Sequence, residues 1–396
     1  DKDLSSRAGH EIRWQGLKGY LDSEVDWSTE TILLVKMRAT DNLSQRSSRL
    51  VNVIATRMLF AWDPVTGWSA EEVPTRSIAW AAAHVCRSEN GWALPDSRID
   101  LQGLWQLEQT WSARGDEFNG GFDSGVTVWD ALQTIMRCGR AVAIQQRGII
   151  RFVRDELKTV PTAFFGPRNI VKGSFSIKYI LPGEDNADAV EIGYFSERNW
   201  KPARVTAKLA DSSASKPAKV KMVGITKKDQ GYREGYYIAA DNRYRRRMVT
   251  FRTRLEALSC SYGDLAVISH PMPQWGQGGE VVEWDPDTGL MTVSEPLTWA
   301  EGVDHYIGLR KRDNALSGPW KVEPVPDQPR QLLVVEDLDI TPYTGAEEER
   351  THFAFGPDLD WCRFAKIRGV RPRGNQVEVT AAIEDERVHE DPPPLA

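Results

Sequence analysis

The turn Asp285-Pro-Asp-Thr-Gly289, between the runs at residues 280–284 and 290–293, gives the clearest indication of fold in this sequence. Asp, Pro and Gly each favour a tight turn, and glycine adopts the left-handed backbone that such turns require. The flanking runs alternate apolar and polar residues with the period of a β-strand. The stretch therefore predicts a β-hairpin.

Short alternating runs of this kind recur from Tyr262 onward. Further strands are predicted at residues 265–269, 305–310, 321–325, 331–335, 352–355, 363–371 and 376–384. Many short strands at regular spacing are typical of a β-barrel or a β-sandwich. The glycine cluster at residues 276–279 is interpreted as a loop, because it lacks the Lys-Ser/Thr pair and the following helix of a phosphate-binding loop.

The first part of the chain combines strands with a helical insertion. Strands are predicted at residues 11–20, 31–39 and 49–60, and helices at residues 75–89, 101–111 and 124–138, where apolar side chains recur at helical spacing. Gly139 is expected to cap the third helix. A hairpin is expected to follow, with strands at residues 141–144 and 149–153.

The middle of the chain has a different pattern. Two strands are predicted at residues 175–180 and 189–195, joined by a turn at residues 182–186. Residues 211–219 are small and polar and are interpreted as a surface loop. A helix at residues 231–247 and a strand at residues 248–255 complete this part.

Together these patterns predict a multi-domain, β-dominated α+β protein with barrel- or sandwich-like domains and a helical insertion at about residues 75–139. We expect a β-rich domain at residues 1–156, an α+β domain at 157–256 and a barrel or sandwich at 257–388. Residues 389–396, which are rich in proline, are interpreted as a linker to further domains.

Composition narrows the class of protein. The 396 residues are 41% hydrophobic and 27% charged, which is ordinary for a globular protein, and no apolar run is long enough for a membrane-spanning helix. The net charge of -6 gives no general electrostatic reason to bind nucleic acid. Four widely spaced cysteines form no CxxC pair and are expected to be reduced and buried. The 15 tryptophans are consistent with extensive protein contacts.

No motif indicates an enzyme, a cofactor or a metal site. The six histidines show no metal-binding spacing, and we expect structural roles for His270 and His352. The carboxylate pairs Asp358/Asp360 and Asp116/Glu117 could be a glycosidase dyad, but solvated turns are the favoured interpretation. We therefore predict no catalytic, cofactor-binding or metal-binding residues.

The strongest charge feature is the cluster Arg243, Arg245, Arg246 and Arg247 at the end of the predicted helix. One interpretation is a solvated face whose cations complement the helix dipole. A second is a subunit or partner contact, because the planar guanidinium pairs well with carboxylates. Contact with DNA ranks third, since the chain is acidic overall.

Several segments resemble the central hub region of bacteriophage tail-tip proteins of the host-specificity protein J type. They are Phe164-Phe-Gly-Pro-Arg-Asn-Ile170, Gly173-Ser-Phe175, Ala187-Asp-Ala-Val-Glu-Ile-Gly-Tyr194, Val249-Thr-Phe251, Tyr262-Gly-Asp-Leu-Ala-Val-Ile-Ser-His270 and Arg350-Thr-His-Phe-Ala-Phe-Gly-Pro357. Residues 37–44 and 51–56 are similar to a less uniform part of the same family. The resemblance spans most of the chain.

The resemblance implies a virion structural protein at the distal end of the phage tail, made in the cytoplasm of the host bacterium. It implies a homotrimer that contacts distal tail and tape-measure proteins, closes the tail tube, and connects indirectly to a host cell-surface receptor. It implies no catalytic residues and no sequence-specific nucleic-acid binding. Two alternatives stay open: a carbohydrate- or peptidoglycan-active tail enzyme, and an adhesin that binds the host directly.

Overall fold

The computed structural model describes residues 53–122, 125–180, 189–358 and 361–395. From Thr56 onward the chain forms one compact unit. The strands predicted at residues 11–20 and 31–39, and the turn at 182–186, lie outside the described residues. The strand predicted at residues 49–60 lies partly within them and is short there, since β1 covers only Met58–Leu59.

Short two-stranded pairs lead into the helical insertion. The strand β1 pairs with β4 (Val73–Pro74), and β2 (Trp62–Asp63) pairs with β3 (Gly67–Trp68). The three predicted helices are confirmed as α1 (Ile78–Arg87), α2 (Leu101–Arg114) and α3 (Val128–Arg137). A side chain caps each N-terminus: Ser77, Asp100 and Thr127 each accept a hydrogen bond from a backbone N–H of the first turn.

Gly139 does not cap α3 as predicted. The residue with left-handed backbone after this helix is Arg140, with φ of 58°. Gly139 instead lies against the indole of Trp111, which donates a hydrogen bond to the Gly139 carbonyl over 2.8 Å. A Cβ at Gly139 would lie 2.2 Å from Trp111 Nε1, so this glycine is required for close packing.

The hairpin after α3 is confirmed. Its strands are β5 (Ala141–Gln146) and β6 (Ile149–Arg154), joined by Arg147 and Gly148, which both have positive φ. Two consecutive residues with positive φ are typical of the turn that matches the twist of paired strands.

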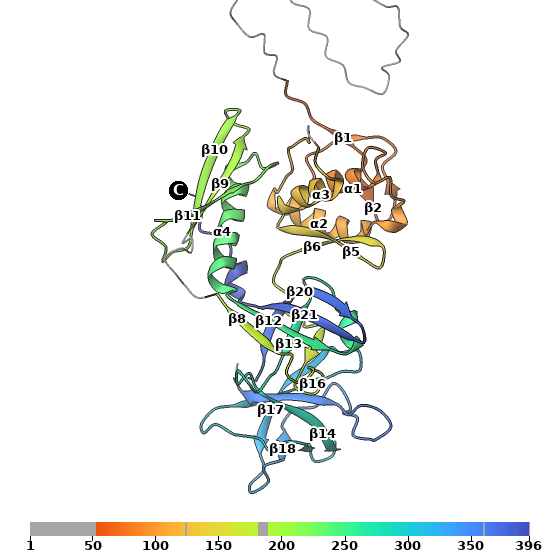
Figure 1. The fold of residues 1–396 in the computed structure, drawn as a ribbon, viewed down its shortest axis with the longest axis vertical. Coiled ribbons are helices and arrows are strands. Elements are labelled where there is room, and N and C mark those ends of the chain that lie inside the picture. Colours follow the sequence, from red (N-terminus) through yellow and green to blue (C-terminus); the bar gives the residue numbers. More distant parts are fainter. Residues whose placement is uncertain (1–52, 123–124, 181–188, 359–360, 396) are drawn as a thin grey trace, which may run out of the picture. The chain divides into compact units, whose positions relative to one another are not determined.

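A three-stranded sheet follows and packs on a long helix (Figure 1). Its strand order is β10 (Lys201–Lys208), β9 (Ala189–Ser196), β11 (Pro217–Lys221), and the helix is α4 (Lys228–Tyr244). The sequence did not indicate β10, and the loop predicted at residues 211–219 is wrong over its last three residues, which belong to β11. Strand β11 runs parallel to β9, so its pairing depends on a residue far along the chain and not on a local turn.

A six-stranded sheet collects strands from distant parts of the chain. Its order is β7 (Ala163–Phe165), β13 (Leu265–Ile268), β20 (Arg363–Arg373), β21 (Gln376–Ile383), β12 (Arg247–Thr253), β8 (Ser176–Tyr179). A 3-10 helix, η2 (Leu255–Ser259), follows β12. Fully buried Phe165 and Phe251 meet edge to face in its core, with ring centroids 5.1 Å apart.

The chain between β13 and β20 forms a closed barrel, so the predicted barrel or sandwich is a barrel. Its strands, in order around the barrel, are β14 (Gln277–Asp285), β15 (Leu290–Val293), β18 (Gln331–Val334), β17 (Leu316–Pro324), β16 (His305–Arg310) and β19 (His352–Pro357). The hairpin at Asp285–Gly289 is confirmed: the Gly289 N–H donates to the Asp285 carbonyl over 2.9 Å.

The loop predicted at residues 276–279 is wrong, because residues 277–279 begin β14 and pair with β19. Glycine is required at positions 278 and 279 because neighbouring atoms already occupy the space that a side chain would need. A Cβ at Gly278 would lie 2.8 Å from Pro167, and one at Gly279 would lie 2.5 Å from the Ser294 hydroxyl.

The hydrophobic clusters combine ranges that the predicted domain boundaries separate. One cluster joins the helical insertion and the β5–β6 hairpin to the β9–β11 sheet and α4. Another joins β7 and β12 to β13, β20 and β21. The boundaries at residues 156/157 and 256/257 stay predictions, but the packing of buried side chains crosses both.

Candidate functional site

The four arginines predicted as a contact cluster do not share one setting. Arg243 is in the last turn of α4, Arg245 ends that helix, Arg246 follows it, and Arg247 begins β12. Arg243 pairs with Asp211 over 2.7 Å at the surface, and Arg246 donates to the Asn242 carbonyl over 3.0 Å. A subunit contact through Arg243, Arg246 and Arg247 stays a prediction.

Arg245 is different, because its side chain is only 1% exposed. Its guanidinium binds Asp155 over 2.6 Å, Asp241 over 2.8 Å and Glu384 over 2.6 Å. Arg245 therefore does not lie on a solvated face, and a subunit or partner contact through it stays a prediction. It is an internal charge, and its partners are the residue after β6, a residue of α4 and the residue after β21.

Asp155 is the centre of this buried charge network. Besides Arg245 it binds Lys366 of β20 over 2.5 Å, Arg368 over 3.2 Å, and the Tyr237 hydroxyl over 2.5 Å. The Lys366 side chain is 2% exposed and also donates to the Glu156 carbonyl over 2.6 Å. One carboxylate thus connects the end of the β5–β6 hairpin to α4 and to the six-stranded sheet.

The network extends to η4 (Glu386–His389) near the C-terminal end of the described chain. His389 Nε2 lies 2.7 Å from a Glu384 carboxylate oxygen and 2.8 Å from Arg245 Nη2. Both neighbours compete for one ring nitrogen, so the tautomer of His389 decides which hydrogen bond it forms.

The pKa directions match this arrangement. Burial opposes ionisation of Asp155, but the charges of Arg245 and Lys366 outweigh it and hold the pKa of Asp155 well below its usual range. Burial likewise opposes ionisation of Glu384, and the hydrogen bonds from His389 and Arg245 hold its pKa below the ordinary value. Burial lowers the pKa of Lys366 and raises that of Tyr237.

The carboxylates of Asp155, Asp241 and Glu384 balance the cations of Arg245, Lys366 and Arg368. A buried charge that loses its partner costs several kcal/mol, so such a network fixes the relative position of the segments that contribute to it. Among the described residues, no group of His, Cys, Asp or Glu side chains has the arrangement of a metal site. The ion pairs of this network hold together the chain segments that contribute to it.

A second group of ion pairs includes Asp116 and Glu117. The solvated turn predicted for this pair is wrong for Asp116. The Asp116 side chain is 1% exposed and binds Arg233 of α4 over 2.6 Å and Arg114 over 3.1 Å, so it is not in a solvated turn. Glu117 binds Lys227 over 2.8 Å. The two carboxylates connect the end of α2 to the start and middle of α4. Of the other pair, Asp360 lies outside the described residues.

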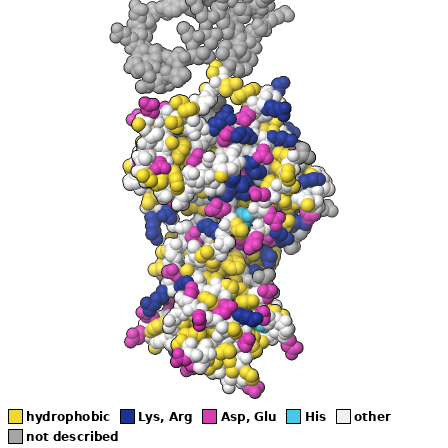
Figure 2. Space-filling model, turned by 180° about the vertical axis from the view of Figure 1, so that it is seen from behind, with side chains coloured by type: hydrophobic (Ala, Val, Ile, Leu, Met, Phe, Trp, Pro, Cys, Tyr) yellow, Lys and Arg dark blue, Asp and Glu magenta, His cyan; other side chains and the backbone are white. Residues whose placement is uncertain are grey.

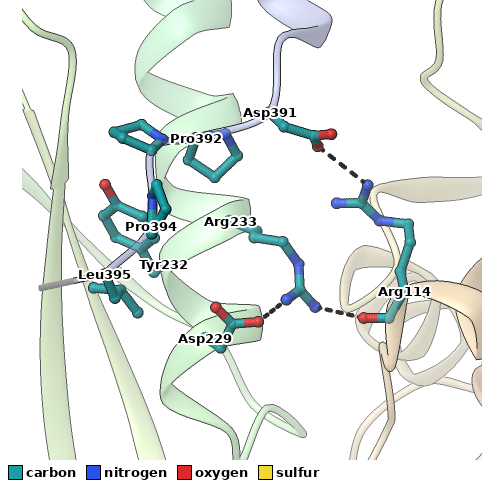
Figure 3. A pocket seen from close by; sticks show the side chains of 9 residues that line it. Arg114, Asp229, Tyr232, Arg233, Asp391, Pro392, Pro394 and Leu395 are labelled. Atoms are coloured by element: carbon teal, nitrogen blue, oxygen red, sulfur yellow. Dashed lines mark hydrogen bonds and ion pairs between the residues drawn. The ribbon is translucent and has the colours of Figure 1, made fainter.

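A pocket of about 260 Å³ lies beside these ion pairs (Figure 3). It is lined by Arg114, Asp229, Tyr232, Arg233 and residues 391–395, and Asp391 lies 3.6 Å from Arg114. Leu395 packs on the hydrophobic cluster that includes α4. Residues 391–395 of the linker predicted at residues 389–396 thus lie against the chain around α4.

The histidines and cysteines singled out in the sequence pack against other side chains. His270 stacks on Phe175 with ring centroids 4.0 Å apart, and His352 is buried in β19. All four cysteines are buried and reduced, as predicted. Burial raises the pKa of the Cys86 and Cys138 thiols to about 12 and that of Cys260 to about 11.

Sequence reasoning missed Asp155 and Glu384, which bind Arg245, and Lys366, which binds Asp155. Asp155 and Lys366 are 211 residues apart, and each lies beside ordinary strand residues. No local pattern distinguishes them from the exposed charges at other strand ends.

No helix in the described part of the chain has the length and apolar character needed to cross a membrane.

Comparison with known proteins gives one family match and several structural similarities. Residues 127–284, from the start of α3 to the end of β14, match the family described as "Putative phage tail protein". No curated protein sequence matches the chain. The family match supports a phage tail protein and a location in the virion tail, and it does not single out the host-specificity protein J type.

Three solved structures are similar over most of the chain at low identity. A chain of the virion of a native gene transfer agent particle has 13% identity and a TM-score of 0.44 over 81% of this chain. The tail protein of Neisseria meningitidis MC58 has 10% identity and a TM-score of 0.31 over 66%. The 43 kDa tail protein of prophage MuSo2 from Shewanella oneidensis has 11% identity and a TM-score of 0.29 over 80%. This chain spans 50%, 56% and 66% of their lengths.

Proposed function

We propose, from the match to phage tail proteins over residues 127–284, that this chain is a structural subunit of a phage tail-tip hub. In this role it closes the tail tube and connects the tube to host-recognition proteins during adsorption and DNA delivery. It assembles as a homotrimer and contacts distal tail and tape-measure proteins. The family match carries the proposal.

The buried charge networks support a mechanical role over a chemical one. Asp155 connects a hairpin, a helix and a sheet, and Asp116 connects two helices, through charges that are almost fully enclosed. Enclosed ion pairs hold packed elements in one arrangement. A protein that transmits force along a tail needs elements that move together.

Immunogold electron microscopy tests the location. Antibodies against this chain are applied to intact virions of the source strain and to virions with mildly disrupted tail tips. We expect label at the distal end of the tail. Label on the capsid, or unlabelled tails whose tips are accessible, would overturn the hub proposal.

A separate assay tests the absence of enzymatic activity. Purified chain is added to bacterial cell walls, with a known wall hydrolase as the positive control and heat-denatured chain as the blank. We expect turbidity and released sugars to stay at the level of the blank. Release above the blank would favour the wall-degrading alternative.

A further inference from the structure

We propose that the outer face of the β9–β11 sheet binds the outer face of the barrel of a second copy of this chain. The proposal deepens the hub function, because it names the surfaces through which copies meet. It rests on opposite charge and on apolar side chains that both surfaces expose.

The strand register defines the first surface. Val190, Ile192 and their cross-strand partners face α4, so the neighbouring positions of each strand face away from it. The cations Arg204, Lys208, Lys219 and Lys221 share this outer face with a single carboxylate, Glu191. We call this surface the basic face.

The basic face is accessible and largely unpaired. The Arg204 side chain is 70% exposed and lies 3.5 Å from Glu191. Within the described residues, Lys208, Lys219 and Lys221 are exposed and form no ion pair. Phe195 and Trp200 are 45% and 49% exposed at one end of it, with ring centroids 6.5 Å apart. Exposed aromatic rings are typical of the centre of a protein interface, and charged side chains of its rim.

This surface differs in charge from the rest of the chain. Residues 189–221 contain 7 Lys and Arg and 3 Asp and Glu, although the whole chain has a net charge of -6. Residues 277–357, which form the barrel, contain 16 Asp and Glu and 6 Lys and Arg. Figure 2 shows Asp and Glu side chains spread over the barrel. Two copies of the chain therefore have surfaces of opposite charge through which they can attract each other.

The barrel register locates the complementary surface. Asp285 of β14 lies opposite Leu290 of β15, Leu290 opposite Leu333 of β18, and Leu333 opposite Glu323 of β17. Glu283 lies two residues before Asp285 on the same side of β14. The three carboxylates are exposed, form no ion pair within the described residues, and border two half-buried leucines. We call this surface the acidic face.

The two faces match in kind. The basic face has four cations and one carboxylate beside exposed aromatic rings, and the acidic face has three carboxylates beside two half-buried leucines. Because the faces lie on different parts of the chain, a contact between them is heterologous, and repeating it can close a ring of copies.

Charge reversal with sedimentation velocity tests the contact. The basic-face variant carries Arg204→Glu, Lys219→Glu and Lys221→Glu, and the acidic-face variant carries Glu283→Lys, Asp285→Lys and Glu323→Lys. We expect each variant alone to lose self-association by at least about tenfold in Kd, and a chain with all six changes to regain it, because both faces then have reversed but complementary charge. We also expect an equimolar mixture of the two variants to associate.

Matched controls change the net charge of the chain by the same amount, through substitutions at other exposed positions. Lys172→Glu, Lys178→Glu and Arg371→Glu match the first variant, and Glu71→Lys, Glu72→Lys and Glu89→Lys match the second. We expect both controls to associate like the unchanged chain. Circular dichroism and Tm establish that each variant is folded. Should a variant not fold, the unchanged chain still gives a test: its association weakens between about 0.05 M and about 0.5 M salt.

The inference is overturned if the unchanged chain is monomeric at the highest concentration it tolerates or if the six-change chain stays monomeric. It is also overturned if the control variants lose as much self-association as the basic-face and acidic-face variants. Binding of duplex DNA or of anionic vesicles to the basic face of a monomeric chain would also overturn it. Tail-tip label without self-association removes this inference and leaves the hub role. Self-association with label elsewhere removes the hub role and leaves the inference.

Discussion

Gly139 shows how one side chain elsewhere can decide the identity of a residue. Its place just after α3 predicted a helix cap, but its carbonyl accepts the indole hydrogen bond of buried Trp111, and the ring occupies the place of a side chain. The sequence contained the glycine but no sign of the ring, because Trp111 is 28 residues away in another helix.

We therefore expect Gly139→Ala to destabilise the protein by about 1–3 kcal/mol, the usual cost of extra volume in a packed core. Urea denaturation followed by tryptophan fluorescence measures the change. Gly121→Ala is the control, because a Cβ there would have open space around it. Equal losses in the two variants would contradict the packing explanation.

Asp155 illustrates a residue whose importance comes from its partners. Replacing it by Asn leaves Arg245 and Lys366 buried with one carboxylate fewer, so we expect a loss of about 3–5 kcal/mol at pH 7. The matched control is Asp211→Asn, which breaks the exposed pair with Arg243 and should cost less than about 1 kcal/mol. Urea denaturation at pH 7 compares the two.

The same variant gives a pH test. The pKa of Asp155 is lowered in the folded state from its ordinary 3.8, so its contribution is present above that value and is lost as pH falls through the folded pKa. We expect the unchanged protein to lose stability below about pH 4, and Asp155→Asn to lose less over the same interval. Parallel pH profiles for the two proteins would contradict this.

At the scale of elements, strand alternation was a dependable guide in the barrel. The runs predicted at residues 290–293 and 305–310 coincide with β15 and β16. The prediction missed β10 and β11, and for β11 the reason is that it pairs in parallel with a strand that precedes it by more than 20 residues. Short polar segments show no alternation strong enough to reveal such pairing.

Two adjacent leucines of β18 test this alternation. Leu332 is fully buried inside the barrel and Leu333 lies on the outer side, half buried. We expect Leu332→Ala to cost about 2–5 kcal/mol, because it leaves a cavity, and Leu333→Ala to cost about 1 kcal/mol. Thermal denaturation of both variants measures the difference, and a reversed order would place β18 in the other register.

At the scale of the whole molecule, the barrel is an insertion within another sheet. It occupies the chain between β13 and β20, which are hydrogen-bonded neighbours in the six-stranded sheet. The boundaries predicted at residues 257 and 388 enclose the barrel together with only part of that sheet.

We expect residues 276–358 to fold alone, because the barrel closes on itself around its own hydrophobic cluster. Residues 157–256, one of the predicted domains, should stay unfolded, because β8 and β12 would lack β13, β20 and β21. Circular dichroism melts and amide chemical-shift dispersion compare the two fragments. A cooperative melt of the second fragment would support the predicted boundaries instead.

The sequence by itself determined the local elements: the three helices of the insertion, the β5–β6 hairpin and most barrel strands. These depend on periodicity and turn chemistry within about 15 residues, which a single stretch of chain contains. It also determined the β-dominated class and the burial of the cysteines. Only the tertiary structure decided which strands share a sheet, that Arg245 is internal, and which carboxylates neutralise it. Those outcomes depend on contacts between distant residues, such as Asp155 and Arg368, which are 213 positions apart, and the energy of such contacts arises only when the segments are buried together.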